Sequence, residues 1–238
     1  MLFDYDDSSP FSILEYAQKM INRTFNDLLN DYNKSPYKSY EEAKNESLTA
    51  YADVAVPYEA KPAAKGELGS FIEKYYFGYK PNSDSNPDFI KAGVELKQTP
   101  IDILKSGKFS AGERLSITMI SFQEPVTENF YKSHLWKKIQ LILLIHYIRD
   151  KSVDRYDYVI KYVNLFTPTE EDLQIIREDY RKINDKIKAG KAHEISESDT
   201  LYLGASTKGS TAIKSQVPQY YGNHTLAKRR NFCFKRSY

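Results

Sequence analysis

Hydrophobic residues recur with the spacing of an amphipathic helix in three parts of the chain. Residues 10–29 and residues 66–77 place apolar side chains three or four positions apart, which predicts one helix over each range. The clearest helix is predicted over residues 167–189, where Thr169 and Asp172 match a capping box. Glycines are expected to end the second and third of these helices: Gly78 and Gly190.

Four other stretches alternate or run apolar in the manner of β-strands. They are residues 89–99, 114–122, 138–147 and 156–166. A short helix around residues 41–49 is also expected before them. Because helices and strands are interspersed along the chain, the pattern predicts an α/β fold with a mixed sheet.

Composition narrows the class of protein. Hydrophobic residues make up 41% and charged residues 28% of 238 residues, which is ordinary globular usage and excludes a disordered or fibrous chain. The length favours a single domain over residues 1–238, built as two lobes. The longest aliphatic run, residues 141–145, is too short to cross a membrane, and residues 1–10 are too acidic for a secretory signal. We therefore expect a cytoplasmic protein with no membrane partner.

Few residues suit a zinc or thiol site. Cys233 is the only cysteine, which excludes an internal disulfide and a multi-cysteine zinc site. The histidines are dispersed without metal-ligand spacing: His134, His146, His193 and His224. A zinc site is therefore not expected.

Charge is distributed unevenly, although the net charge is only +2. Residues 1–60 hold eleven acidic residues and five basic ones. Residues 201–238 contain no Asp or Glu and carry seven basic residues. Clustered basic residues gain affinity for phosphates by displacing counterions, so this end predicts a polyanion-binding surface. The alternative is a solvated basic tail, but Phe232 and Phe234 alternate as in a strand and favour a folded surface.

The segment that carries chemistry is Pro87-Asp88 followed by Glu95-Leu96-Lys97. If this segment is extended, Leu96 enters the core while Glu95 and Lys97 share the other face. Gly93 permits a sharp turn that could bring Asp88 beside Glu95. Two carboxylates suit Mg²⁺, and a lysine beside them could orient the attacking water. The alternative reading is a surface strand with an ordinary ion pair.

This pattern resembles the nuclease superfamily named for Pro-Asp followed by Glu-x-Lys. Two longer stretches carry a narrower resemblance: residues 65–73, Lys-Gly-Glu-Leu-Gly-Ser-Phe-Ile-Glu, and residues 92–100, Ala-Gly-Val-Glu-Leu-Lys-Gln-Thr-Pro. Together they look like the MutH family, which comprises a mismatch-repair nicking endonuclease and restriction endonucleases that cut at GATC. The sequences of residues 82–88 and 108–115 resemble the restriction enzymes more than they resemble the mismatch-repair enzyme. The resemblance implies a restriction-endonuclease-like mixed sheet flanked by helices, arranged as a two-lobed clamp around double-stranded DNA.

The resemblance also implies roles for particular residues, with a catalytic lobe centred on residues 65–125 and a DNA-recognition segment at about 190–238. Asp88 and Glu95 match metal ligands for Mg²⁺, and Lys97 matches the lysine that orients water. Glu73 matches a further acidic residue of the site, and Lys137, or its neighbour Lys138, matches a lysine from the second lobe. The DNA-binding residues expected from the basic end are Lys208, Gly209, Lys228, Arg229, Arg230 and Lys235.

The sequence departs from the family pattern in two places. Cys233 stands where the mismatch-repair enzyme carries a tyrosine implicated in sensing adenine methylation, so we expect cleavage at GATC to be independent of that methylation. The related restriction enzymes also carry a second DNA-binding domain, which is expected to be absent from this chain. Two alternatives remain beside the restriction endonuclease: a non-catalytic DNA-binding effector module of the same fold, and a mismatch-repair nickase.

Overall fold

The computed structural model describes residues 3–44, 67–80, 85–209, 215–223 and 225–238. Its central element is a sheet with the strand order β2-β1-β4-β5. The strands are β1 (Glu95–Ile103), β2 (Phe109–Ala111), β4 (Ile142–Ile148) and β5 (Ile160–Phe166). β1 and β4 run parallel, whereas the β1–β2 and β4–β5 pairs are antiparallel. The expectation of a mixed sheet flanked by helices is confirmed.

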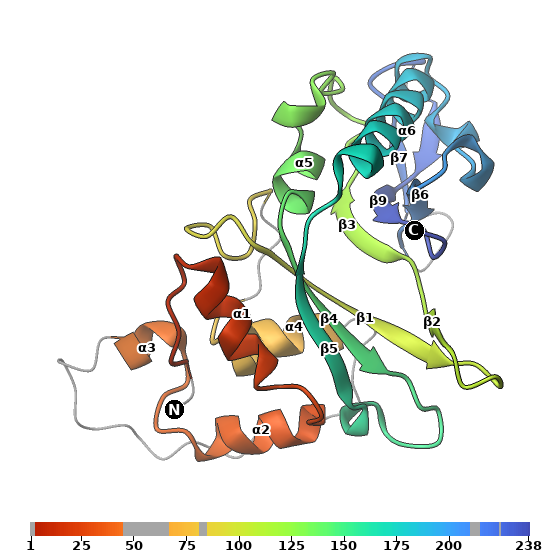
Figure 1. Ribbon diagram of the computed structural model, residues 1–238. Helices are drawn as coiled ribbons and strands as arrows, with labels where there is room; N and C mark the ends of the chain where they lie inside the picture. The colour runs from red at the N-terminus through yellow and green to blue at the C-terminus, as the bar shows by residue number, and fades with distance from the viewer. Residues whose placement is uncertain (1–2, 45–66, 81–84, 210–214, 224) are drawn as a thin grey trace.

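One face of this sheet is covered by helices from the first part of the chain (Figure 1). These are α1 (Pro10–Gln18), α2 (Phe25–Lys34), α3 (Tyr40–Lys44), α4 (Glu67–Phe71) and the π-helical turn η1 (Ile72–Tyr76). Their buried aromatic residues pack against Leu96, Leu143 and Ile145 of the sheet. This packing forms the hydrophobic core of a first lobe. It removes the apolar side chains on that face of the sheet from water.

The single helix expected over residues 10–29 is wrong, because the chain forms α1 and α2 with a turn between them. Asn22 has a positive φ of 65°, and its backbone N–H donates to the Ile160 carbonyl oxygen at 2.8 Å. The Thr24 side chain then caps α2 in a reciprocal capping box with Asp27. A helical period continues across the turn in the sequence, but Thr24 and Asp27 begin a new helix.

The helix expected over residues 66–77 is present as α4 followed by the π-helical turn η1, while Gly66 lies outside the described residues. Gly78 ends it with a φ of 73°, as expected. An added Cβ there would lie 2.4 Å from the Tyr40 backbone nitrogen, so the position requires glycine. A π-helical turn shifts the directions in which the following side chains point. Glu73 lies in this turn. The short helix expected around residues 41–49 is seen as α3, and residues 45–49 lie outside the described part.

A second lobe surrounds a separate hydrophobic core. Its main sheet has the order β3-β9-β6, formed by β3 (Leu115–Met119), β6 (Leu203–Thr207) and β9 (Arg230–Phe234). β7 (Gln216–Pro218) and β8 (Leu226–Lys228) form a small hairpin. Helices α5 (His134–Ile139) and α6 (Glu170–Lys188) pack in this lobe, above the four-stranded sheet in Figure 1. Single 3₁₀ turns lie at Phe130–Lys132, Arg155–Asp157, Ala192–Glu194 and Glu197–Asp199.

The structure divides the expected catalytic lobe of residues 65–125 between the two sheets. β3 pairs with β9 of the second sheet, so residues beyond about 112 leave the sheet that contains β1. The start of the strand expected over residues 138–147 is also wrong, because α5 continues to Ile139 and β4 begins at Ile142. Likewise β1 begins at Glu95, after a turn at residues 90–93.

Helix α6 is formed as predicted. Thr169 and Asp172 make the reciprocal capping box, and Gly190 follows the helix with a φ of 71°. Gly190 packs against Gly222 so closely that an added Cβ would lie 2.5 Å from the Gly222 Cα. Within the described residues, the helices are too short or too polar for a membrane span.

Candidate active site

A turn at the start of β1 brings Asp88 to the strand. Phe89 and Val94 form an antiparallel bridge with N···O distances of 2.9 and 3.2 Å, and Gly93 closes the turn with a φ of 67°. An Asp88 carboxylate oxygen, Oδ2, then accepts a hydrogen bond from the Leu96 backbone N–H at 2.8 Å. The turn predicted at Gly93 therefore does place Asp88 against the Glu-x-Lys strand.

Glu95 and Lys97 share one face of β1, as the two-residue period of a strand predicts. Between them Leu96 points into the core of the first lobe, where it is 4% exposed. The Lys97 ammonium donates a hydrogen bond to Glu95 Oε1. The Glu95 side chain is only 1% exposed and the Lys97 side chain 19%, so this pair is largely shielded from water.

The lysine of the second lobe that contacts Glu95 is Lys138, which the sequence left open as the alternative to Lys137. Lys138 Nζ lies 3.0 Å from both carboxylate oxygens of Glu95. Consecutive residues of a helix point in directions about 100° apart, and Lys138 lies on the side of α5 that faces the sheet. Lys137 is half-buried, and within the described residues its ammonium pairs with no carboxylate.

Glu73, on the π-helical turn, lies near the same carboxylates. Burial, together with the negative charge of Asp88, raises the pKa of Glu73 to about 7, while Lys97 acts in the opposite direction. Burial also raises the pKa of Glu95, against the influence of Lys97 and Lys138. Three carboxyl groups therefore compete for two ammonium groups in a poorly solvated place.

The donor set suits a hard divalent cation. Asp88, Glu95 and Glu73 supply carboxylate oxygens, and Glu73 and Asp88 line a small cavity of about 30 Å³ with Leu96 and Phe77. Such a volume holds about one water molecule or ion. Among the described residues no three of the acidic, histidine or cysteine side chains converge as a ready-made metal site. Glu95 in particular is engaged by ammonium groups, so its oxygens must change partners to ligate a metal.

Four of the expected DNA-binding residues lie close together at one end of the second lobe. The Lys208 backbone N–H donates to the Arg229 carbonyl oxygen at 2.8 Å, and Lys228 precedes Arg229 at the end of β8. The side chains of Lys208, Lys228 and Arg229 are exposed. Gly209 has a φ of 109° and faces Ser215, where an added Cβ would lie 2.5 Å away. The loop thus needs glycine beside three exposed cations.

Arg230 and Lys235 are engaged inside the lobe. Arg230 Nη1 donates to the Ala205 carbonyl oxygen at 2.8 Å, and burial lowers the pKa of its guanidinium. Lys235 Nζ donates to the Glu197 carbonyl oxygen at 2.6 Å and to the Thr200 carbonyl oxygen. One donor of Arg230 and the ammonium of Lys235 therefore bind backbone carbonyl oxygens, whereas Arg230 Nε is buried without a hydrogen-bond partner among the described residues. That these two residues contact DNA stays a prediction. A charge count along the sequence does not show where these side chains point.

Cys233 lies in the middle of β9 and is fully buried. It is paired with Ser116 of β3 and Gly204 of β6, and a Cβ added at Gly204 would lie 3.3 Å from its Sγ. Its neighbour Asn231 is held on the same face by hydrogen bonds with Ser116 and Ser206. Position 233 therefore presents a small, covered thiol.

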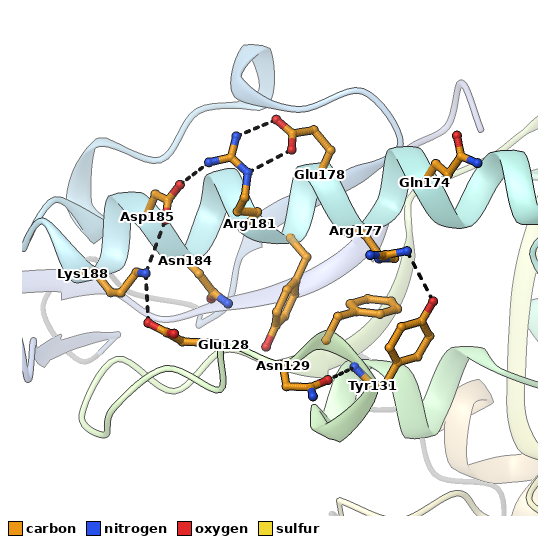
Figure 2. A pocket seen from close by; sticks show the side chains of 12 residues that line it. Glu128, Asn129, Tyr131, Gln174, Arg177, Glu178, Arg181, Asn184, Asp185 and Lys188 are labelled. Atoms are coloured by element: carbon orange, nitrogen blue, oxygen red, sulfur yellow. Dashed lines mark hydrogen bonds and ion pairs between the residues drawn. The ribbon is translucent and has the colours of Figure 1, made fainter.

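A cavity of about 660 Å³ lies away from these residues, between α6 and the segment of residues 128–131 (Figure 2). Most of its charged groups are paired with one another, and Arg177 contacts the Tyr131 hydroxyl at 3.5 Å. Arg181 bridges Glu178 and Asp185, at 2.7 and 2.6 Å. Lys188 bonds Glu128 at 3.1 Å, as Figure 2 also shows. These mutual pairs leave the cavity without a concentrated charge for phosphate, so size alone does not identify the site.

A family model and several known proteins are similar to this chain. The family model described as DNA mismatch repair enzyme MutH matches residues 77–179, which include Asp88, Glu95, Lys97 and Lys138. The type II restriction enzyme Sau3AI of Staphylococcus aureus is 38% identical over 182 residues, 76% of this chain and 37% of the relative. The DNA mismatch repair proteins MutH of Shigella boydii serotype 18 and Escherichia coli O127:H6 are each 28% identical over 196 residues, covering 80% of this chain and 81% of the relative. The chain thus spans little more than a third of the length of Sau3AI.

Proposed function

Since this chain belongs to the MutH family, we propose that it is a site-specific endonuclease that hydrolyses phosphodiester bonds of double-stranded DNA. The observation that carries this proposal is the cluster at the start of β1. Asp88 is held against this strand, and the ammonium groups of Lys97 and Lys138 contact the buried Glu95 carboxylate. A surface strand with an ordinary ion pair would leave its carboxylate in water, whereas Glu95 is buried with two ammonium groups. Buried and exchangeable charge of this kind favours a catalytic role.

We propose Mg²⁺ as the cofactor, held by Asp88 and Glu95. When bound, the ion would lower the pKa of a coordinated water and offset negative charge on the phosphate. Asp88 keeps Oδ1 available, because the Leu96 N–H occupies Oδ2. Glu73 adds a third carboxyl group, whose pKa of about 7 lets it accept a proton near neutral pH.

Lys97 would orient the attacking water and stabilise the negative charge that develops on phosphorus-bound oxygens. Its ammonium is fixed next to Glu95 on the same strand, so it requires little rearrangement when substrate arrives. Water is largely excluded around these carboxyl groups, so the local dielectric is low. The attraction between Lys97 and the developing negative charge is therefore stronger than it would be in water.

The exposed cations Lys208, Lys228 and Arg229 are the proposed DNA-binding surface. Lysine can donate to guanine O6 and N7 in the major groove, and Lys208 lies on the Gly209 loop that the family resemblance assigns to reading GATC. Lys228 and Arg229 would contact phosphates, which position the duplex without reading its sequence. We propose that the protein acts in the cytoplasm on GATC-containing duplexes.

Independence of adenine methylation is a further part of the proposal. The Cys233 thiol is small and covered by the neighbouring strands, so it offers no large side chain to contact the adenine base. Equal cleavage rates on methylated and unmethylated GATC duplexes are expected. Strong inhibition by methylation would contradict this part while leaving the nuclease intact.

A mismatch-repair nickase is the second candidate. It is favoured by the even coverage of the MutH proteins, of which this chain spans 81%. The higher identity to Sau3AI, 38% against 28%, favours the restriction enzyme. Both candidates require the same carboxylates, and the product distinguishes them.

The test is incubation of the protein with supercoiled plasmid that contains GATC, with Mg²⁺ and with EDTA, followed by mapping of the fragment ends. A plasmid lacking GATC is the matched control. Metal-dependent cuts confined to GATC support the endonuclease, with linear product indicating restriction and nicked circles indicating a nickase. Salt-sensitive binding without cutting would instead favour the non-catalytic effector module.

A further inference from the structure

Lys138 is a buried cation whose ammonium is bound to the carboxylate proposed as a metal ligand. Its Nζ is 3.0 Å from each oxygen of Glu95, and the Lys138 and Glu95 side chains are 10% and 1% exposed. Both oxygens are therefore occupied from one side, while Lys97 also donates to Oε1. A metal ion could ligate Glu95 only if the Lys138 ammonium moved away, because two positive charges at the same carboxylate repel each other.

The position of Lys138 is fixed by the second lobe. Its helix α5 begins at Ser133, whose Oγ accepts from the Trp136 N–H at 3.0 Å and donates to the Phe130 carbonyl oxygen at 2.6 Å. Leu135 and Ile139 of the same helix are 1% and 0% exposed in the second core. The backbone at Lys138 is therefore rigidly placed, and only its long side chain is free to exchange partners.

The backbone at Glu95 is fixed from the other side. Its N–H donates to the Leu141 carbonyl oxygen at 3.0 Å, and Glu95 is paired in register with Ile142 at the start of β4. Because α5 leads directly into β4, the distance between the two backbones is set by a short, well-packed segment. Exchange of the ion pair is thus a side-chain event that does not require the lobes to separate.

A charge count shows what such an exchange would do. Glu73, Asp88 and Glu95 carry up to three negative charges, and Lys97 and Lys138 carry two positive ones. With all three carboxyl groups ionised the site carries a net charge of −1, so a divalent cation alone would leave it at +1. A divalent cation together with one phosphodiester restores the balance, and a displaced lysine can bind the phosphate as a point charge.

We propose that Lys138 is an internal counter-ion that occupies Glu95 in the metal-free protein and passes to the substrate phosphate when metal binds. Metal and DNA then bind with positive coupling, and free metal binds weakly. This inference rests on the proposed nuclease function, because it takes Glu95 as the metal ligand and DNA as the phosphate. Lys138 is not a metal ligand in this proposal; it competes with the metal for Glu95 and then contacts the phosphate.

The test uses isothermal titration calorimetry with Ca²⁺, which takes the same hard oxygen ligands as Mg²⁺. Lys138→Met removes the charge and keeps an unbranched side chain, and Lys137→Met is the matched control on the adjacent helical position. Without DNA, K138M is expected to bind Ca²⁺ about tenfold more tightly than wild type, and K137M to match wild type. Equal or weaker Ca²⁺ binding by K138M would overturn the proposal.

Reciprocal measurements separate the counter-ion from a merely structural role. Ca²⁺ is expected to raise the affinity of the wild type for a GATC duplex, and this enhancement should shrink by the same factor of about ten in K138M, since linkage is symmetric. Lys138→Arg keeps the charge and should restore the wild-type coupling. An undiminished enhancement in K138M would contradict the proposal. If K138M is unfolded by circular dichroism, Lys138→Gln provides the same comparison.

Failure of the proposed function would be recognised separately. A wild-type protein that neither binds nor cuts GATC duplexes would refute the nuclease assignment, while the DNA-free Ca²⁺ titration would still report whether Lys138 competes with a cation at Glu95. A protein that cuts GATC while K138M and wild type bind Ca²⁺ equally would refute only the counter-ion.

Discussion

Glu95 and Asp179 are both carboxylates buried in the protein, but they are stabilised by different partners. Asp179, on α6, is 1% exposed and accepts hydrogen bonds from the backbone N–H groups of Leu201, Tyr202 and Leu203 at 2.7 to 3.0 Å. Glu95 is equally buried and is bound by the side chains of Lys97 and Lys138. Backbone donors cannot leave, whereas lysine ammonium groups can exchange partners.

The comparison teaches how a structural carboxylate differs from a chemical one. Asp179 fastens the segment at the start of β6 to α6, because three backbone N–H groups donate to its carboxylate, most of them to Oδ2. Glu95 lies beside two further carboxyl groups, and burial raises its pKa. Burial alone therefore does not identify a site; burial with replaceable partners does.

The largest expected effect is on catalysis. Lys97→Ala should reduce single-turnover cleavage of a GATC duplex by about three orders of magnitude or more while DNA binding is retained, because Lys97 acts on the transition state. Lys91→Ala is the matched control, since Lys91 is an exposed lysine near the same turn that pairs with Asp7 at 3.0 Å. Wild-type cleavage rates for the Lys97 variant would contradict the proposed role of Lys97 in the transition state.

Stability should fall by different amounts when the two carboxylates are replaced. Asp179→Asn replaces an acceptor oxygen by an amide that faces backbone donors, so the free energy of unfolding should fall by about 3 kcal/mol. Glu95→Gln keeps one acceptor and leaves Glu73 and Asp88 beside the lysines, so the fall should be less than about 1 kcal/mol. Urea unfolding of the two variants tests this contrast, and equal losses would contradict it.

The basic surface offers a smaller contrast between exposed and engaged cations. Arg229→Ala should weaken DNA binding about threefold to tenfold and reduce the slope of log affinity against log salt by about one. Lys235→Met should leave that slope unchanged, because the Lys235 ammonium is bound to the Glu197 and Thr200 carbonyl oxygens. Fluorescence anisotropy over a salt series measures both. A reduced slope for the Lys235 variant would show that this lysine contacts phosphate.

The smallest effect expected concerns His146 on β4. Burial lowers its pKa in the folded protein, so the unfolded chain binds a proton more readily and stability should fall as the pH drops below about 6.5. His146→Gln should reduce this acid-dependent loss by about 1 kcal/mol at most. Unfolding midpoints at pH 7.5 and 5.5 give the comparison; identical pH dependence in both proteins would be the contrary result.

The features that the sequence predicted best are those set by local periodicity. The two-residue period of a strand placed Glu95 and Lys97 together, and the Thr169 capping box began α6. Periodicity was misleading where a cap interrupts it, as at Thr24. It also gave no basis for choosing between Lys137 and Lys138, because the phase of a six-residue helix is fixed by what it packs against.

Contacts between distant segments could not be read from one sequence. Asp179 reads as a solvated helix residue until residues 201–203 are brought to it. Lys235 and Arg230 read as surface charge, yet the Lys235 ammonium and Arg230 Nη1 bind backbone carbonyl oxygens of the second lobe. The position of β3 in the second sheet depends on pairing with β9, more than 110 residues later in the chain, as the Leu115–Phe234 register pair shows. Each of these depends on tertiary packing that overrides the local pattern.

The central claim is that Glu95 is an exchangeable carboxylate at a metal-dependent nuclease site. Its most direct test is single-turnover cleavage of a duplex with one GATC sequence by wild type and by Glu95→Gln, each with Mg²⁺ and with EDTA. We predict cleavage only by the wild type with Mg²⁺, while the Gln variant remains folded and still binds the duplex. Comparable cleavage by both proteins, or cleavage that persists in EDTA, would contradict the claim.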